Sequence, residues 1–276
     1  MSEPRIAATD RGLLFGDGVF DTTVIIEGQP LAGMAHQERL LRHAAALGID
    51  LPIVRLELAQ TAATREAGRN PAILRTTVTR GVAARGLWPT SAVEPTLLTS
   101  LSPFDPGLVG VPARLITASV PRNERSLLSR IKSLNYLDNV LAAREAAAAG
   151  ADDALILNTN GDVACSTIAN VFALFGRRFA TPPLVDGAMD GVVRSYILAA
   201  PPAGYEAEEA TLAPIDLVRA DGLFLTNSVR LLRPVVGLDG RSFAPHPIAR
   251  TLLEGLLRDL SEGRNFSHLL PGTRPS

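Results

Sequence analysis

The first half of the chain contains segments with the hydrophobic pattern of strands and segments with the hydrophobic spacing of helices. Residues 19–26 are rich in β-branched side chains and predict a strand. Over residues 36–47, Leu40, Ala44 and Leu47 recur at helical spacing, and Gly48 ends the predicted helix. The same analysis predicts a second helix over residues 51–67 and three strands over residues 72–79, 96–101 and 113–120. This half therefore has the pattern of an α/β domain.

Residues 121–130 interrupt this pattern, because they are polar and turn-rich and lack a strong periodicity. We interpret them as a connector between an N-terminal domain over residues 1–120 and a C-terminal domain over residues 131–276. In the second domain the pattern predicts helices over residues 139–149, 191–200 and 247–260, and strands over residues 154–158, 169–175, 221–225 and 234–236. Turn sequences at residues 158–161 and 238–240 indicate hairpins, so we expect a mixed sheet rather than a purely parallel one.

Length and charge limit the classes of function. The 276 residues are enough for two domains with real cores. With 27 basic and 28 acidic residues, the chain has no basic excess for binding nucleic acid or a membrane surface. It contains no apolar run of the ~18 residues needed to span a bilayer, and residues 1–10 lack the layout of a secretion signal. We expect a soluble, cytoplasmic, globular protein.

Cysteine and histidine usage argues against a metal centre. Cys165 is the single cysteine, which excludes an internal disulfide framework and a cysteine-rich zinc site. The four histidines share no metal-ligand spacing; they are His36, His43, His246 and His268. We therefore expect no bound metal.

One residue stands out by composition. Of the 27 basic residues, Lys132 is the only lysine, and the others are arginines. Arginine replaces lysine in most surface roles, but it cannot lose its proton to become a nucleophilic amine. Lys132 is therefore either a solvated charge or a position where only a primary amine works. Its apolar neighbours Ile131 and Leu134 favour the second interpretation, because desolvation lowers the pKa of an amine.

The sequence around Lys132 resembles the class-IV aminotransferase family. The run KSLNYLDNVLAAREA begins at Lys132, and GADDALILN follows at residues 150–158. Three other stretches agree in the expected order: RGLLFGDGVF at residues 11–20, HQERLLR at residues 36–42, and TPPL at residues 181–184 leading to GVVR at residues 191–194. The family comprises fold-type-IV pyridoxal 5'-phosphate (PLP) enzymes, which include D-amino-acid aminotransferase, branched-chain aminotransferase and 4-amino-4-deoxychorismate lyase.

This resemblance implies a two-domain α/β fold of type IV, similar to that of D-amino-acid aminotransferase. It places PLP between the domains and implies a homodimer in which a partner subunit completes each site. It also implies that the chain starts about one strand late relative to the family.

The resemblance assigns the cofactor-binding residues. Lys132 would carry PLP as a Schiff base and later move the α-proton. The phosphate is expected on Arg39, on the backbone N–H groups of Val192 and Val193, and on the Ser228 hydroxyl. A helix start binds phosphate through its free N–H groups, and arginine adds a fork of donors. From the residues alone, Arg39 could be an exposed helix charge beside Arg42, and Ser228 a plain turn hydroxyl.

The resemblance also suggests substrate contacts. In the lyase and D-amino-acid branches, the second arginine of the pattern RGVAARG holds a substrate carboxylate, and Arg85 fits that role. Leu87 and Phe20 stand where D-amino-acid aminotransferases have polar residues, which favours the lyase. Tyr136 would line the pocket. From the residues alone, Arg85 could be a solvated loop charge and Tyr136 a packing residue.

The chain departs from the family at Cys165, where the family has a glutamate that pairs with the pyridine nitrogen of PLP. A carboxylate there keeps the nitrogen protonated and makes the ring a stronger electron sink. A thiol is only a weak donor, so we expect a cofactor ring that is largely neutral.

The leading hypothesis is a PLP-dependent lyase similar to 4-amino-4-deoxychorismate lyase, which eliminates pyruvate and gives 4-aminobenzoate for folate synthesis. One alternative is a D-amino-acid or branched-chain transaminase. A second is a degenerate PLP-binding protein with little activity, because Cys165 replaces the glutamate.

Overall fold

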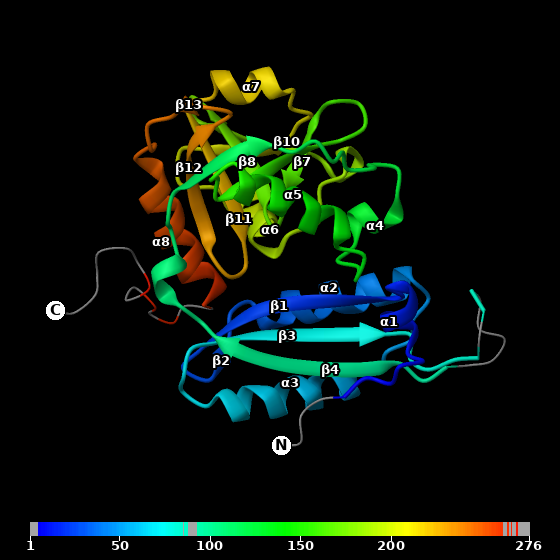
Figure 1. Ribbon diagram of the computed structural model, residues 1–276. Helices are drawn as coiled ribbons and strands as arrows, with labels where there is room; N and C mark the ends of the chain where they lie inside the picture. The colour runs from blue at the N-terminus through cyan, green and yellow to red at the C-terminus, as the bar shows by residue number, and fades with distance from the viewer. Residues whose placement is uncertain are drawn as a thin grey trace. The chain divides into compact units, whose positions relative to one another are not determined.

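The computed structural model describes residues 5–84, 86–87, 93–261, 264, 266 and 269. The chain divides into two compact units (Figure 1). The first comprises Met1–Asp105 and Ile131–Asn135, and the second comprises Pro106–Arg130 and Tyr136–Ser276. The helices are α1 (Arg11–Phe15), α2 (Gly33–Ala46), α3 (Ile53–Ala67), α4 (Leu127–Arg130), α5 (Leu137–Ala148), α6 (Val192–Ala199), α7 (Pro214–Arg219) and α8 (Ile248–Leu260). The strands are β1 (Gly18–Ile26), β2 (Gln29–Pro30), β3 (Ala72–Thr79), β4 (Thr96–Pro103), β5 (Ala113–Thr117), β6 (Asp153–Leu157), β7 (Val163–Ser166), β8 (Asn170–Phe175), β9 (Arg178–Thr181), β10 (Glu206–Glu209), β11 (Gly222–Asn227), β12 (Leu231–Leu238) and β13 (Arg241–Ser242).

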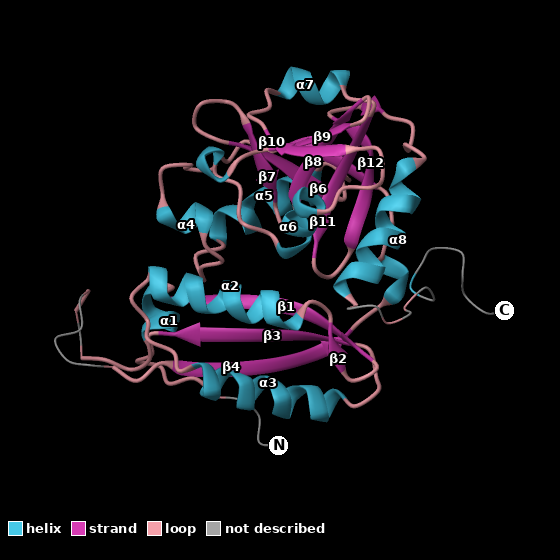
Figure 2. Cartoon of the chain, turned by 180° about the vertical axis from the view of Figure 1, so that it is seen from behind, coloured by secondary structure: helices cyan, strands magenta, loops and turns pink. Residues whose placement is uncertain are grey.

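The first unit is an antiparallel sheet, in the order β2-β1-β3-β4, with two helices on one face. Successive side chains of β1 point to opposite faces, so Val19 and Phe20 face different sides of the sheet. Val19 packs in one apolar cluster with Leu40 of α2 and Leu56 of α3. Figure 2 shows both helices on the same side of the sheet. Burial of apolar residues on this face holds α2 and α3 in place.

The second unit contains a mixed sheet in the order β10-β9-β8-β11-β12-β5-β6-β7, with β13 beside β12. β5 pairs in parallel with β6 and with β12, while β8, β11 and β12 pair antiparallel. Its core includes Val171, Leu223, Leu225 and Val235, all nearly inaccessible to solvent. α5 packs on β6, α6 on β11 and α8 on β12. The mixed sheet that the hairpin signals predict is thus confirmed.

The longer predicted helices and strands are present, with ends that differ by up to three residues. The missed elements are short, because two to six residues are too few for a period to show in the sequence. They are α1, α4, α7, β2, β7, β9, β10 and β13.

The boundary between the units differs from the predicted domain boundary at residue 120. β5 belongs to the second unit, because Leu115 pairs with Asp153 of β6 and with Leu238 of β12. Residues 121–130, the predicted connector, also belong to that unit, and Ile131–Asn135 returns to the first. A local sequence pattern identifies a strand but not the sheet it joins, which depends on long-range pairing.

Candidate active site

Lys132 lies on a short stretch of chain that pairs with the edge of β1. The Phe20 N–H donates to the Lys132 carbonyl at 2.9 Å, and Val19 and Ser133 form an antiparallel bridge beside this bond. The backbone at Lys132 is therefore fixed to the first unit. Because opposed residues share a face, the Lys132 side chain lies on the face of β1 that carries Phe20.

The Phe20 ring is in contact with two cations. Lys132 Nζ lies 4.5 Å from the ring centroid, and Arg75 Cζ lies 3.6 Å from it. Phe20 is opposite Thr77 in the β1–β3 register, so Arg75 is its diagonal neighbour on the same face. Both contacts have the distance of a cation–π interaction. Phe20 therefore lies beside the lysine, and Arg75 is a further cation there that the sequence analysis missed.

His43 fastens the backbone of Lys132 to α2. Its Nδ1 accepts a hydrogen bond from the Lys132 N–H at 3.1 Å. An accepting Nδ1 requires the neutral ring with its proton on Nε2. His36, Arg39 and His43 recur at helical spacing, and all three are buried. The sequence shows only the helical spacing of these three polar residues. It does not show what they bind, because their hydrogen-bond partners lie in distant segments of the chain.

Asp21 and Arg39 form a buried ion pair. Arg39 donates from Nε to Asp21 Oδ2 at 2.9 Å and from Nη2 to Oδ1 at 3.0 Å. His36 Nδ1 lies 2.6 Å from the same Oδ1. Burial raises the pKa of Asp21, but the charges and hydrogen bonds of His36 and Arg39 outweigh it and hold that pKa well below its usual range. Arg39 is therefore not an exposed helix charge, and its partner Asp21 is a buried carboxylate that the sequence analysis missed.

The start of α6, in the second unit, has the geometry of an anion site. Gly191 is the N-cap residue, so the N–H groups of Val192 and Val193 lie in the first turn and have no intrahelical acceptor. A Cβ at Gly191 would lie 2.0 Å from Asn170 Oδ1, so a larger residue would not fit. Thr226 pairs with Asn170 across β11 and β8.

The Thr226 hydroxyl adds a hydrogen-bond donor near the start of α6. Its Oγ1 is buried and, among the described residues, has no hydrogen-bond partner. Buried hydroxyls are normally bonded, and a helix start with an adjacent hydroxyl suits a phosphate group. These residues therefore fit the phosphate of PLP.

The remaining predicted site residues are Ser228, Tyr136 and Arg85. Ser228 is half-buried in the turn between β11 and β12, where Asn227 Oδ1 accepts from the N–H of Val229. Tyr136 is half-buried and is the N-cap residue of α5. Arg85 lies outside the described residues. The structure thus brings Lys132 together with Phe20, and the start of α6 together with the end of β11.

Cys165 is buried in the middle of β7. It pairs with Ile156 of β6 and packs with Ala142 and Ala146 of α5. Burial raises the pKa of the Cys165 thiol, although the charge of Arg122 opposes this effect. The side chain is therefore a neutral thiol at physiological pH, as the sequence analysis assumed.

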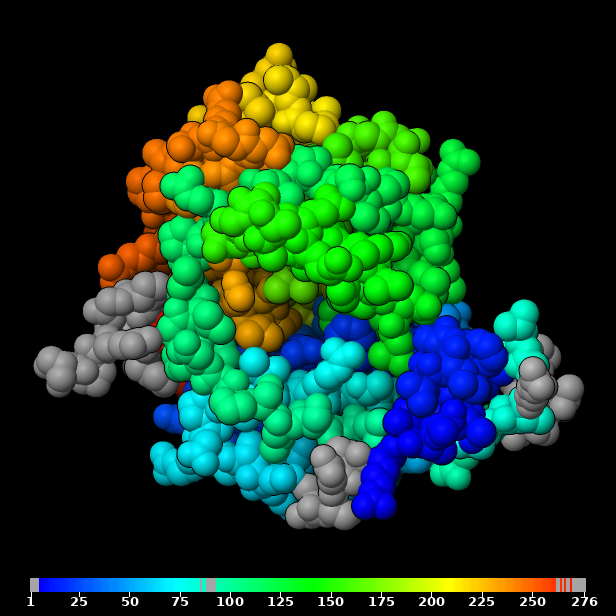
Figure 3. Space-filling model, viewed as in Figure 1, coloured from blue at the N-terminus to red at the C-terminus, as the bar shows by residue number. Residues whose placement is uncertain are grey.

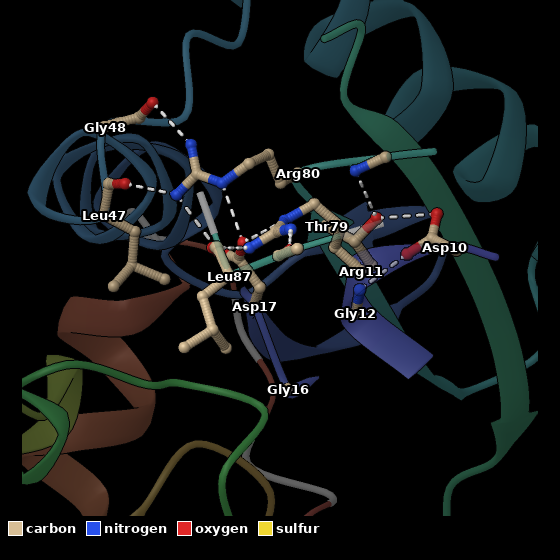
Figure 4. A network of polar contacts seen from close by, with 12 residues as sticks. Asp10, Arg11, Gly12, Gly16, Asp17, Leu47, Gly48, Thr79, Arg80 and Leu87 are labelled. Atoms are coloured by element: carbon tan, nitrogen blue, oxygen red, sulfur yellow. Dashed lines mark hydrogen bonds and ion pairs between the residues drawn. The ribbon is translucent and has the colours of Figure 1, made fainter. Parts of the chain in front are cut away.

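Asp17 bridges two arginines near α1 (Figure 4). It accepts from Arg11 Nε and from Arg80 Nε, both at 2.8 Å. The other two nitrogens of Arg11 donate to the carbonyls of Gly86 and Leu87. Partial burial raises the pKa of Asp17, but the hydrogen bonds and charges of Arg80 and Arg11 outweigh it and lower that pKa. The cluster fixes the backbone that directly follows the predicted substrate arginine.

The described ranges contain neither a metal-ligand cluster nor a helix suited to cross a membrane. Within residues 5–84, 86–87 and 93–261 and the three isolated positions beyond, no three His, Cys, Asp or Glu side chains are arranged to hold a metal ion. In the same part of the chain, no helix combines the length and apolar character that crossing a bilayer requires.

Comparison with known proteins decides the family. The sequence model of amino-transferase class IV matches residues 18–238, which is most of the chain. The chain belongs to the class IV aminotransferase family. Members of this family are PLP-dependent transaminases or lyases, so the chain is a PLP-dependent enzyme of this kind. The resemblance seen in the sequence is confirmed.

The similar proteins carry three different activities in their names. A Methanocaldococcus jannaschii protein, named provisionally as a branched-chain-amino-acid aminotransferase, is 35% identical over 87% of this chain and 84% of its own length. The D-alanine aminotransferase of Bacillus licheniformis is 31% identical over 92% of both chains. The solved 4-amino-4-deoxychorismate lyase of Pseudomonas aeruginosa is 30% identical, with a TM-score of 0.83, over 93% of this chain and 96% of its own. The fold is thus that of the fold-type-IV enzymes, as predicted.

The ion pairs of Asp17 make stability sensitive to acid. Because the pKa of Asp17 is lower in the folded chain than its ordinary value of 3.8, its contribution is complete above that value and is lost as the pH falls through the folded pKa. We expect Asp17→Asn to reduce the free energy of unfolding at neutral pH by about 1–2 kcal/mol. The variant should also lose less stability than the wild type on acidification. Urea unfolding from neutral pH to about pH 3 measures both effects, with the exposed Asp50→Asn as control. Equal acid slopes for the wild type and Asp17→Asn would contradict the assignment.

Proposed function

We propose that this chain is a lyase similar to 4-amino-4-deoxychorismate lyase, which releases pyruvate and forms 4-aminobenzoate for folate synthesis. Family membership supports a PLP-dependent reaction at an amino substrate. The observation that carries the choice of a lyase is the buried, neutral Cys165 at the position where the family has glutamate.

The proposed roles follow the positions of the residues. Lys132 Nζ would hold the cofactor aldehyde and would move the proton of the substrate carbon. Arg39, the start of α6 at Val192 and Val193, and Ser228 hold the phosphate. When bound, PLP supplies an electron sink for the carbanion that proton removal creates. Phe20 packs against the lysine, and its contact with Lys132 Nζ restricts where that amine can lie.

The charges around Lys132 support an anionic substrate. The Arg75 guanidinium and the Lys132 amine both contact the Phe20 ring. Arginine binds carboxylates through its planar fork of donors. We propose that Arg85 adds a second carboxylate contact. Arg11 supports this role, because it fixes the backbone of Gly86 and Leu87 that follows Arg85. Tyr136 would line the same pocket.

The thiol at Cys165 favours elimination over transamination. Without a carboxylate, the pyridine nitrogen of the cofactor is not kept protonated, and the ring withdraws electrons less strongly. Reversible transamination needs a long-lived carbanion. In elimination from aminodeoxychorismate, pyruvate would leave with the electron pair and the product would gain an aromatic ring. The demand on the electron sink is therefore lower.

A second candidate function is amino-acid transamination. The 35% identity to the M. jannaschii protein favours a branched-chain-amino-acid substrate, and the D-alanine aminotransferases are similar over nearly the whole chain. Both activities would use Lys132 and Arg39 in the same way. A PLP-binding protein without efficient catalysis is the third candidate, since it also tolerates Cys165.

We further propose that the protein is a cytoplasmic homodimer. α1 exposes three successive apolar side chains, Leu13, Leu14 and Phe15. Leu87 is 81% exposed and lies beside α1, because Arg11 holds its carbonyl. The segment that contains α1 lies on the surface shown in Figure 3, in blue. A contiguous exposed apolar patch is typical of a protein–protein interface.

Covalent trapping tests the role of Lys132. We expect the purified protein to be yellow and to lose its visible absorbance on borohydride reduction, with the pyridoxyl label on Lys132. Peptide mass spectrometry locates the label. Lys132→Arg keeps the charge but cannot form the imine, so it should lose both the label and turnover. Full turnover by Lys132→Arg would remove the entire scheme.

Two product assays separate the candidate functions. We expect release of 4-aminobenzoate and pyruvate from aminodeoxychorismate, with little pyruvate-dependent amine transfer from D- or branched-chain amino acids. Amine transfer without 4-aminobenzoate would establish the transaminase instead. Bound PLP with no product in either assay would establish the binding protein.

Cys165→Glu tests the account of the cofactor ring. We expect this change to raise any transaminase activity by about tenfold, the effect of one pKa-unit of differential stabilisation, because the carboxylate keeps the ring nitrogen protonated. Cys165→Gln has similar size without the charge and serves as the matched control. A fall in transaminase activity in folded Cys165→Glu would count against this account.

Sedimentation tests the homodimer. A charge at Leu14 would be buried without a partner in the proposed interface, so Leu14→Glu should shift the protein from dimer to monomer. Ile215→Glu, at an exposed position on α7 in the second unit, is the control and should leave the dimer intact. A monomeric wild type would refute the homodimer.

A further inference from the structure

We propose that His43 is a positioning residue that sets the direction in which the Lys132 side chain leaves the backbone. This inference rests on the proposed role of Lys132 in the site. It concerns a buried side chain to which neither the family resemblance nor the proposed function assigns a role.

The backbone of Lys132 is held at both of its polar atoms. The Phe20 N–H donates to the Lys132 carbonyl at 2.9 Å, and the Lys132 N–H donates to His43 Nδ1 at 3.1 Å. These two atoms belong to the two peptide planes that meet at the Lys132 Cα, and rotation of those planes is what turns a side chain. One bond to each plane therefore fixes the direction of the Cα–Cβ bond.

His43 supplies a bond that a regular strand ladder would supply itself. Val19 and Ser133 form an antiparallel bridge, so Phe20 and Lys132 are the next opposed residues. In a regular ladder, two residues opposed at this place exchange both of their N–H to carbonyl bonds. Here Phe20 donates to Lys132, whereas the Lys132 N–H turns to His43. The ladder thus ends at the lysine, and a side chain of α2 takes over its last bond.

The acceptor and the donor of this bond are held by the same core. Leu40 and Ala44, on the helix that carries His43, pack in one apolar cluster with Ile131. Ile131 directly precedes Lys132. Burial of this cluster fixes both the helix that provides the ring and the chain that provides the N–H. His43 is therefore a fixed acceptor for the lysine backbone.

A packing role alone predicts a different result from a positioning role. If the His43 ring only fills space, a leucine of similar size replaces it without an effect on Lys132. If Nδ1 positions the lysine, leucine removes the acceptor of a buried N–H group. Asparagine keeps an acceptor, because its Oδ1 occupies the place of the histidine Nδ1. The two variants thus separate the hydrogen bond from the packing.

The experiment measures how fast Lys132 attaches to PLP. The full chain, stripped of cofactor, is mixed with rising concentrations of PLP, and borohydride is added at set times. The amine condenses with the aldehyde with loss of water, borohydride adds hydride to the C=N bond, and peptide mass spectrometry quantifies the label on Lys132. The limiting rate constant reports on the position of the amine, and the half-saturating concentration reports on cofactor binding.

We expect His43→Leu to lower the limiting rate constant about tenfold, the effect of losing one hydrogen bond. The half-saturating concentration should stay within about twofold of the wild-type value, because the phosphate contacts are unchanged. His43→Asn should bring the rate constant back to within about threefold of wild type.

Leu56→Ala is the matched control. Leu56 belongs to the same core cluster but lies on α3, so its truncation lowers the thermal stability without touching the bond to Lys132. We expect this variant to keep the wild-type rate constant. An equal loss of rate in Leu56→Ala and His43→Leu would overturn the proposal, because stability alone would then explain the effect.

The remaining outcomes separate this inference from the proposed site. A wild type that gains no label on Lys132 contradicts the proposed site itself. A labelled wild type with an unchanged rate constant in folded His43→Leu, or with equal losses in His43→Leu and His43→Asn, overturns only the positioning role. Where His43→Leu does not fold, His43→Gln replaces it, because glutamine carries its carbonyl one atom further from the backbone. His43→Gln should also lower the rate constant, and a wild-type value would overturn the proposal.

Discussion

The hydrogen bonds that hold residues 131–135 against β1 are the interaction on which the site depends. The chain leaves the first unit after Asp105, contributes β5 and α4 to the second, and returns for five residues before leaving again. Lys132 lies within this return, with its carbonyl bonded to the Phe20 N–H and its N–H bonded to His43. A lysine has a long, flexible side chain, so a fixed backbone and an adjacent aromatic ring restrict where its amine can act.

In the first unit, a buried or partly buried aspartate lies between two basic side chains at two places. Asp17 lies between Arg11 and Arg80, and Asp21 lies between His36 and Arg39. In the first cluster the arginines use their other donors to hold backbone carbonyls, including those of Gly86 and Leu87. A bidentate carboxylate thus orients an arginine as well as neutralising it. A buried pair of this kind fixes the orientation of its side chains even where the cost of desolvation cancels the stabilisation from charge attraction.

Cys165 is the residue on which our choice between elimination and transamination rests. The family shares its cofactor, and the relatives with different activities are similar to this chain over most of its length. The fold and the lysine therefore do not decide between elimination and transamination. In our proposal the electronic state of the cofactor ring makes this choice, because a stronger electron sink would favour transamination. Cys165 is a buried thiol, held neutral among the alanines of α5, at the position where the family resemblance leads us to expect a glutamate.

The sequence by itself determined the long elements and the family, and it singled out Lys132 as the candidate catalytic residue. Periodicity over eight or more residues is a local property, and a single lysine among arginines is visible without a structure. Only the tertiary structure decided that β5 joins the second sheet and that Arg39 is buried against Asp21. It also decided that His43 binds the Lys132 backbone and that Arg75 lies over the Phe20 ring. Each of these facts depends on pairing between segments far apart in the chain. Local patterns carry no information about such partners, because strand register and helix packing choose them when the chain folds.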